Sequence, residues 1–445
     1  MLNPTLFQAG AATLCITPPL GTLINGELEP RVAARIHDDL FVRALALDDG
    51  ANRLAFAIVD TCVLDRPVCE EARRLIQERS GLLPSNVLIA AVHTHSGGSV
   101  CSVHLTEADE TYRRWVPSQI AEAVRQAVNN LVPAQIGWGS GAVPQHVFCR
   151  RLFIKPGMTY VNQLGQTGDR VKMNWDSPHP ADGEPSGPTD PELFVVSLQH
   201  PDGRPLALLA NYSLHYVGDV PPGDISADYF GAFANRVAEL VGADESFVGI
   251  LSNGTSGDIN NYNPKTGPPS GAPYTQVRKV AEDVAQEVCR VTQGIHYRSA
   301  VPLRAMWREC PVATRRPPPA EVVEARAVLA GRSRSQLSGW TENYAREQIL
   351  LSDYPPKVSL PLQVFRVGEL AIAAWPGEVF ARTGLALKRR RPPHFNIELA
   401  NGWFGYIPPP EQFSLGGYET WRMRTSFLEP DAASKILSCF TEMLA

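Results

Sequence analysis

Residues Val87–Gly98, with the sequence VLIAAVHTHSGG, join an apolar run to a cluster of chemically active side chains. The six apolar residues Val87–Val92 predict a buried strand. Alternate residues of a strand point to the same side, so His93 and His95 share a face if the strand continues to Ser96. The two glycines that follow let another backbone approach closely. The stretch therefore predicts a strand that ends in a metal site or a proton-transfer site.

Four other apolar runs end in the same way. They are PLALLANYSL before His215, FVGILS before Asn253–Asp258, LAIAAWPG before Glu378, and FNIELA before Asn401–Tyr406. Buried strands that end in functional side chains build pockets at one edge of α/β sheets. Runs with helical spacing of apolar residues lie between several of these strands. The pattern predicts a mixed α/β fold and an enzyme with one convergent site.

Composition narrows the class of protein. The chain has 445 residues, of which 44% are hydrophobic and 20% charged, so a large core is expected. A net charge of −5 argues against nucleic-acid binding. No apolar run approaches the roughly 18 residues that a membrane span needs, so we expect no membrane insertion.

The cysteines and the N-terminus predict a cytoplasmic protein. The first residues, MLNPTLFQAGAATLCITPP, lack the basic start of a signal peptide. The eight cysteines are scattered without metal-binding or redox spacing, and we expect reduced core thiols. They are Cys15, Cys62, Cys69, Cys101, Cys149, Cys289, Cys310 and Cys439.

The organisation of the chain predicts a single domain over residues 1–445. Residues 155–190 and 263–274 are rich in Gly, Pro and polar residues and lack periodicity. Loops of this length in a compact protein are usually functional, so we expect them to form substrate walls. A helical insertion is expected at residues 317–352. No linker or repeat is present.

The residue types at the strand ends suit a zinc centre. An H-x-H pair is weak evidence by itself, His215 could equally be a core histidine, and Glu378 could cap a helix. Two imidazoles, one carboxylate and a phenolate nevertheless make a plausible zinc shell with an open water position. Asp60, which ends another apolar run, could orient a ligand histidine or stabilise a turn.

Five ordered segments resemble the neutral ceramidase family. They are NVLIAAVHTHSGG, LLANYSLHYVGD, FVGILSNGTSGD, AAWPGEVF and NGWFGYIPPPEQFSLGGYE. The resemblance implies that family's catalytic domain, with two packed β-sheets flanked by helices, and zinc-dependent cleavage of an amide bond. It implies four metal ligands, which are His93, His215, Glu378 and Tyr406. The immunoglobulin-like C-terminal domain of the family has no counterpart among these segments.

The resemblance also implies four catalytic residues. His95 would assist the water, and Tyr418, twelve residues after Tyr406, matches a further active-site tyrosine. Arg150 matches the arginine of the family's Asn-Arg-Ser motif, with Arg151 directly after it. Asn260 stands where the family has a functional serine, and its amide can donate a hydrogen bond but cannot act as a hydroxyl nucleophile.

These features together predict a zinc-dependent amide hydrolase. The polar loops favour a small-molecule substrate that is smaller and more polar than ceramide. Three alternatives remain open from the sequence: an esterase or lactonase, a metal-dependent isomerase or lyase acting on a polar acid, and a non-catalytic scaffold that kept the fold. The replacement at Asn260 favours the last of these. A homo-oligomer also stays open.

Overall fold

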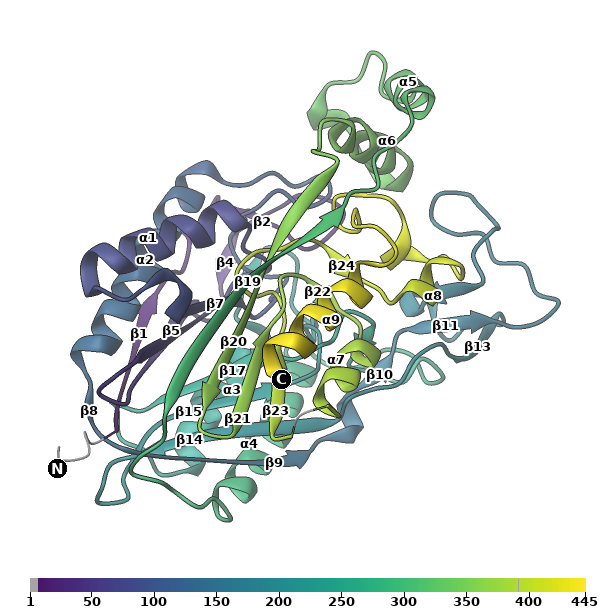
Figure 1. The fold of residues 1–445 in the computed structure, drawn as a ribbon. Coiled ribbons are helices and arrows are strands. Elements are labelled where there is room, and N and C mark those ends of the chain that lie inside the picture. The colour runs from purple at the N-terminus through teal and green to yellow at the C-terminus, as the bar shows by residue number, and fades with distance from the viewer. Residues whose placement is uncertain (1–6, 391) are drawn as a thin grey trace.

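Two β-sheets pack face to face in the computed structural model, which describes residues 7–390 and 392–445 (Figure 1). The first sheet has the order β7-β6-β5-β1-β8. Its strands are β1 (Gln8–Cys15), β5 (Phe41–Asp48), β6 (Arg53–Val59), β7 (Val87–Ala91) and β8 (Val132–Pro133). The second has the order β17-β15-β14-β9. Its strands are β9 (Gln135–Ala142), β14 (Glu192–Gln199), β15 (Pro205–Tyr212) and β17 (Val248–Asn253).

Helices cover the outer face of each sheet (Figure 1). Helices α1 (Arg66–Ser80) and α2 (Glu110–Asn129) lie against the first sheet, and α3 (Asp228–Leu240) and α4 (Thr275–Thr292) against the second. Helix α1 begins where the Asp65 side chain accepts a hydrogen bond from the Val68 amide. The predicted mixed α/β class, with two packed sheets between helices, is confirmed.

A third sheet packs beside the other two, which the sequence did not lead us to expect. Its order is β19-β20-β21-β23. The strands are β19 (Leu303–Ala313), β20 (Lys357–Val367), β21 (Leu370–Ala374) and β23 (His394–Ile397), and α9 (Ala432–Leu444) packs on the sheet. The Phe365 ring meets Phe56 of the first sheet at a centroid distance of 5.2 Å, and Phe395 meets Phe194 of the second at 5.0 Å. One continuous core therefore joins all three sheets.

The segments with long insertions extend from this core. Helices α5 (Pro319–Val328) and α6 (Gly339–Ser352) lie between β19 and β20, at one end of the molecule (Figure 1). Residues 263–274 form turns only, whereas residues 155–190 contain more structure than the absence of periodicity indicated. They contribute β12 (Val171–Met173) and β13 (Asp182–Pro185), which pair with β11 (Arg151–Ile154) in a small sheet with the order β12-β11-β13. Strands of three or four residues are too short to show a periodic pattern in sequence.

The remaining elements are short. They are β2 (Leu23–Ile24), β3 (Arg31–Val32), β4 (Arg35–Ile36), β10 (Phe148–Cys149), β11 (Arg151–Ile154), β12 (Val171–Met173), β13 (Asp182–Pro185), β16 (Asp224–Ile225), β18 (Ile259–Asn260), β22 (Glu378–Val379), β24 (Tyr406–Ile407), α7 (Ala381–Lys388) and α8 (Pro410–Phe413). Within residues 7–390 and 392–445, no helix combines the length and the apolar character needed to cross a membrane.

The eight cysteines carry free thiols, as the sequence indicated, although not all of them lie in the core. Cys62, Cys69, Cys101, Cys149 and Cys310 are buried. Cys15 is exposed, and Cys289 and Cys439 are half-buried. The expectation that every thiol belongs to the core is therefore wrong for these three residues.

Asp60 has a structural contact rather than a contact with a candidate metal ligand. Arg43 Nη1 lies 2.6 Å from both carboxylate oxygens of Asp60, and the amide of Phe41 donates to Oδ2 at 2.9 Å. Both charged side chains are buried, at 6% and 0% exposure. The pair therefore joins β5 to the end of β6 inside the protein.

Replacement of Asp60 by alanine is expected to lower the free energy of unfolding by about 3–5 kcal/mol, because Arg43 would stay buried without a counter-charge. Urea denaturation of the two proteins measures the difference. Asp202→Ala is the matched control, since Asp202 pairs with Arg204 at the surface, where both side chains are 58% exposed. Exposed pairs contribute little. Equal stability of the Asp60→Ala protein and the control would contradict the prediction.

Candidate metal centre and active site

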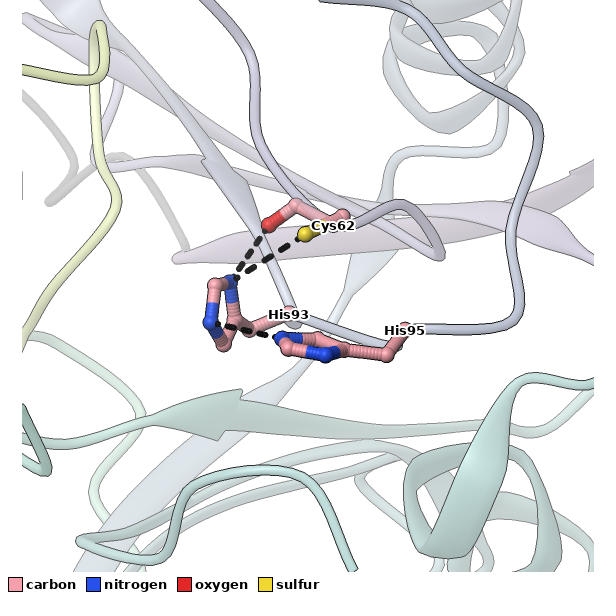
Figure 2. Close-up of side chains that lie close together, drawn as sticks. All are labelled: Cys62, His93 and His95. Carbon is pink, nitrogen blue, oxygen red and sulfur yellow. Dashed lines mark hydrogen bonds between the residues drawn. The ribbon is translucent and has the colours of Figure 1, made fainter. Parts of the chain in front are cut away.

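His93 and His95 are brought together by a turn and not by a continuous strand. Strand β7 ends at Ala91, earlier than expected, and His93 has a φ of 78°. This left-handed conformation is costly for a residue with a side chain and persists only where its surroundings enforce it. The His93 amide donates to the Thr61 carbonyl at 3.0 Å. Even so, the two Nε2 atoms lie 3.2 Å apart (Figure 2).

Backbone carbonyls determine which ring nitrogen of two buried histidines carries the proton. His93 Nδ1 lies 2.8 Å from the Cys62 carbonyl oxygen, and His215 Nδ1 lies 3.1 Å from that of Ser256 (Figure 2 shows the first). A carbonyl only accepts hydrogen bonds, so each Nδ1 donates and each Nε2 keeps a free lone pair. Burial lowers the pKa of His93, and lowers that of His215 well below its usual value. Both rings are therefore neutral.

The free lone pairs face a carboxylate oxygen that has no hydrogen-bond partner. Glu378 Oε2 lies 3.5 Å from His93 Nε2 and 3.7 Å from His215 Nε2, and it is buried and unsatisfied. Three acceptors without an intervening proton repel one another unless a cation lies between them. Tetrahedral zinc with bonds of ~2.1 Å holds its donor atoms about 3.4 Å apart. The residues present fit a zinc ion.

Cys62 is close to this group but does not fit as a ligand. Its Sγ lies 3.7 Å from His93 Nδ1, which is the protonated side of the ring (Figure 2). Burial raises the pKa of the Cys62 thiol well above its usual value. Zinc binds the thiolate rather than the thiol. Cys62 therefore acts through its carbonyl oxygen, which orients the His93 ring.

Tyr406 lies beside Glu378 in a parallel two-strand ladder. Strands β22 and β24 pair Glu378 with Tyr406, so the two side chains leave the same face of the ladder. The second carboxylate oxygen of Glu378 accepts from Trp403 Nε1 at 3.0 Å. The Tyr406 hydroxyl accepts from Arg150 Nη2 at 2.9 Å. The backbone pairing thus places the Tyr406 side chain on the same face as Glu378, with its hydroxyl held by Arg150.

The two neighbouring arginines point in different directions. Arg150 bridges Glu419 and the Tyr406 hydroxyl, whereas Arg151 binds Glu419, Gln412 and the Gly416 carbonyl. Arg150 therefore faces the candidate site and Arg151 faces away from it. Both guanidinium groups share the buried carboxylate of Glu419. Burial tends to lower the pKa of Arg150, but Tyr406 and Glu419 raise it well above its usual value.

His95 has a carboxylate partner that the sequence did not reveal. Its Nδ1 lies 3.3 Å from Glu27 Oε1, and its ring stacks on Tyr216 at a centroid distance of 3.6 Å. Burial lowers the pKa of His95 to about 3. Burial raises the pKa of Glu27, but the hydrogen bond with His95 and the charges of His95, Arg31 and His104 together outweigh it and lower the pKa to about 2. An ionised Glu27 accepts the Nδ1 proton and leaves His95 Nε2 free towards His93.

Replacement of Glu27 by glutamine is expected to lower kcat roughly tenfold to a hundredfold, because the imidazole of His95 loses the charge that orients it. Bound zinc and KM should change little, since Glu27 does not belong to the acceptor group at Glu378. Steady-state kinetics and metal analysis test both points. Glu29→Gln, an exposed change two residues away, is the control. An equal effect of the two substitutions would argue against the orienting role.

Tyr418 is part of the site, whereas Asn260 lies in the wall of the adjoining cavity. The Tyr418 ring is 5.6 Å from the Tyr406 ring, and its hydroxyl lies 3.0 Å from His104 Nε2. Asn260 donates to Asn174 Oδ1 at 3.2 Å and lines a cavity of about 450 Å³ together with His95. The side chains of His93, His95, His215 and Glu378 thus lie within 3.2–3.7 Å of one another in successive pairs. Tyr406 is joined to Glu378 by backbone pairing, and Arg150 and Tyr418 adjoin Tyr406, with Asn260 further out.

Some residues that hold the site escaped the sequence analysis. Glu27 and His104 stand in segments without a pattern that marks them, whereas Trp403 lies in a segment that the sequence analysis singled out but was not itself recognised. Glu398 is different, because it is a charged residue within the apolar run FNIELA and could have been noticed. Its carboxylate accepts from the Ser256 and Val379 amides at 3.1 and 2.7 Å, and Ser256 in turn orients His215.

Two solved structures share the arrangement of helices and strands found in this chain. No protein-family model matches the sequence. A solved neutral ceramidase from Pseudomonas aeruginosa superposes with a TM-score of 0.74 and 17% identity, over 99% of this chain and 74% of that chain. A ceramidase complexed with C2 gives 0.72 and 17%, over 99% and 75%. Over almost its whole length, the chain therefore has the fold of these neutral ceramidases.

Proposed function

We propose that the protein is a zinc-dependent hydrolase that cleaves an amide bond in a substrate smaller and more polar than ceramide. One observation carries the proposal. Glu378 Oε2 is buried without a hydrogen-bond partner, and two proton-free imidazole nitrogens face it at 3.5 and 3.7 Å. A divalent cation satisfies all three groups at once. The shared fold with neutral ceramidases supports the choice of reaction.

His93, His215, Glu378 and Tyr406 would hold the zinc ion. When bound, zinc supplies a Lewis acid that activates water and polarises a carbonyl group. The two histidines present proton-free Nε2 atoms, which is the form of imidazole that binds zinc. Burial raises the pKa of Tyr406 well above its usual value, and the charge of Arg150, which donates to the Tyr406 hydroxyl, opposes this only in part.

His95 is the proposed general base. Its Nε2 is proton-free, adjoins the acceptor group and borders the cavity, so it can accept a proton from water and return it to the leaving nitrogen. Arg150 and Tyr418 would stabilise the negative charge that develops on the carbonyl oxygen. Asn260 would contact the substrate from the cavity wall rather than the reacting atoms.

The cavity next to His95 supports a small polar substrate. Its volume of about 450 Å³ lies within the usual range for small-molecule sites. Several polar or charged side chains line it. They are Glu27, Arg31, His95, Asn260, Asn261 and Gln276. Two long hydrocarbon chains would leave these groups without partners, which is costly.

Metal analysis and a substrate panel test the proposal. The purified full chain is expected to carry about one zinc ion per molecule. It should hydrolyse small N-acylated amino acids faster than a short-chain ceramide, lose this activity to a chelator and regain it with zinc. Turnover of only esters, lactones or isomerisable acids would overturn the amide assignment. A protein without zinc, or with zinc but no turnover, would favour a non-catalytic scaffold.

A further inference from the structure

His104 is a buried histidine that the proposed function has not yet used. Its side chain and backbone together are 4% exposed, and its φ is 51°, in the left-handed region that residues with side chains rarely occupy. Such a conformation persists where the surrounding structure enforces it, and it is concentrated at functional sites. The contacts of His104 therefore indicate its role.

Two arginines hold the backbone of His104 in place. Its carbonyl oxygen accepts from Arg346 Nη1 and from Arg424 Nη2, the latter at 3.4 Å. Arg424 is in turn held by the buried carboxylate of Glu347, which lies 2.7 Å from its Nη2. Arg346 and Glu347 both belong to α6 of the helical insertion. The insertion thus fixes His104 from outside the three main sheets.

The ring of His104 connects α6 to Tyr418. Asn343 of α6 presents its amide nitrogen to His104 Nδ1 at 3.2 Å. With the Asn343 amide nitrogen on this side, Nδ1 accepts, and we place the ring proton on Nε2. Nε2 lies 3.0 Å from the Tyr418 hydroxyl oxygen and donates to it. Burial lowers the pKa of His104 to about 4, which keeps the ring neutral.

We infer that His104 is a positioning residue, which holds the hydroxyl of Tyr418 where it can stabilise the reacting carbonyl oxygen. The inference rests on the proposed function, in which Tyr418 is such a donor. Because the Tyr418 oxygen accepts the hydrogen bond from His104, its own proton is available to an acceptor on the other side, either the Tyr406 hydroxyl or the substrate. The His104 ring is fixed between Asn343 and Tyr418, so its hydrogen bond restricts the rotation of the Tyr418 hydroxyl. A donor that is fixed before the reaction stabilises the charge that develops on the substrate.

Aromatic packing supports the same role for the insertion. The Trp340 ring lies 5.5 Å from Tyr418 and 5.4 Å from His104, and Trp175 lies 5.1 Å from Tyr418. Trp340 begins α6, and Trp175 comes from the loop at residues 155–190 and lines the cavity. Both the helical insertion and the loop at residues 155–190 therefore contribute rings that pack around Tyr418, together with Tyr406 and Trp421.

Two substitutions of His104 separate the contact with Tyr418 from the other contacts. His104→Asn suits the left-handed backbone and places an amide near Asn343, but it is too short to reach Tyr418. His104→Gln places an amide group at the distance of Nε2. Compared with wild type, His104→Asn is expected to lower kcat roughly tenfold to a hundredfold with KM and zinc content unchanged. His104→Gln should recover most of the loss.

A double-mutant cycle with Tyr418→Phe decides whether His104 acts through Tyr418. If it does, His104→Asn has no further effect on kcat once the Tyr418 hydroxyl is absent. Additive losses, or no loss in His104→Asn, would overturn the inference. Melting curves and zinc content show whether each variant is folded. If His104→Asn is not folded, His104→Ala, which also lacks a group that reaches Tyr418, replaces it in the cycle.

One measurement needs no catalytic activity. In ¹⁵N spectra of the histidine-labelled full chain, assigned by difference with His104→Gln, the His104 ring is expected to carry its proton on Nε2. A ring protonated on Nδ1 would overturn the donation to Tyr418. Wild-type protein that shows the expected Nε2 proton but hydrolyses no amide would count against the proposed function, and not against the hydrogen bond.

Discussion

Replacement of His93 by alanine is expected to abolish both zinc binding and amide hydrolysis. The substitution removes the nitrogen that lies 3.5 Å from Glu378 Oε2, and it leaves His215 and Glu378 without their shared partner. Loss of ~4 kcal/mol of transition-state stabilisation lowers turnover on the order of a thousandfold. Metal analysis by mass spectrometry and steady-state kinetics measure the two effects.

His146→Ala is the matched control for this experiment. His146 is also a buried histidine, 2% exposed, and its Nε2 lies 2.7 Å from Asp283 of α4 rather than near Glu378. Its loss should reduce stability but leave zinc content and kcat close to those of wild type. A His93→Ala protein with full zinc content and unchanged turnover would refute the metal centre.

Replacement of His95 by alanine is expected to preserve zinc binding and to impair amide hydrolysis. Zinc should remain, because His93, His215, Glu378 and Tyr406 are intact, whereas kcat should fall by a factor on the order of a hundred to ten thousand. The reason is that His95, whose Nε2 adjoins His93 and whose side chain lines the cavity, is the proposed proton acceptor. The same metal analysis and kinetics apply.

The outcome also tests the identity of the fourth ligand. His95 Nε2 lies only 3.2 Å from His93 Nε2, a separation that zinc ligands can have. If His95→Ala loses zinc and Tyr406→Phe keeps it, His95 is a ligand and Tyr406 is not. If His95→Ala keeps wild-type turnover, the proton acceptor is another group.

The buried strands and the polar residues that follow them could be predicted from the sequence, because both depend on local chemistry. Strand β7 has five consecutive buried residues, as a parallel strand covered on both faces requires. The hairpin of β5 and β6 around Asp49 and Gly50 follows from its turn residues. The order of the polar endings carried the resemblance to the neutral ceramidases, and the fold confirms it.

The reason given for the approach of His93 and His95 was nevertheless wrong. Strand alternation was expected to place the two rings together, but β7 ends at Ala91 and the left-handed backbone of His93 does so instead. A conformation of this kind is imposed by tertiary contacts, here the hydrogen bond from the His93 amide to Thr61. Sequence patterns report the preferences of isolated segments and do not contain such constraints.

The sequence by itself determined which side chains with metal-binding and proton-transfer chemistry follow the buried strands. Only the tertiary structure decided how these side chains are oriented. The Cys62 and Ser256 carbonyls orient His93 and His215, Glu27 orients His95, and His104 holds Tyr418. Every residue has a backbone carbonyl oxygen, so the residue type does not show which carbonyls orient a histidine. Distant partners meet only when the packed sheets and the α6 insertion bring them together.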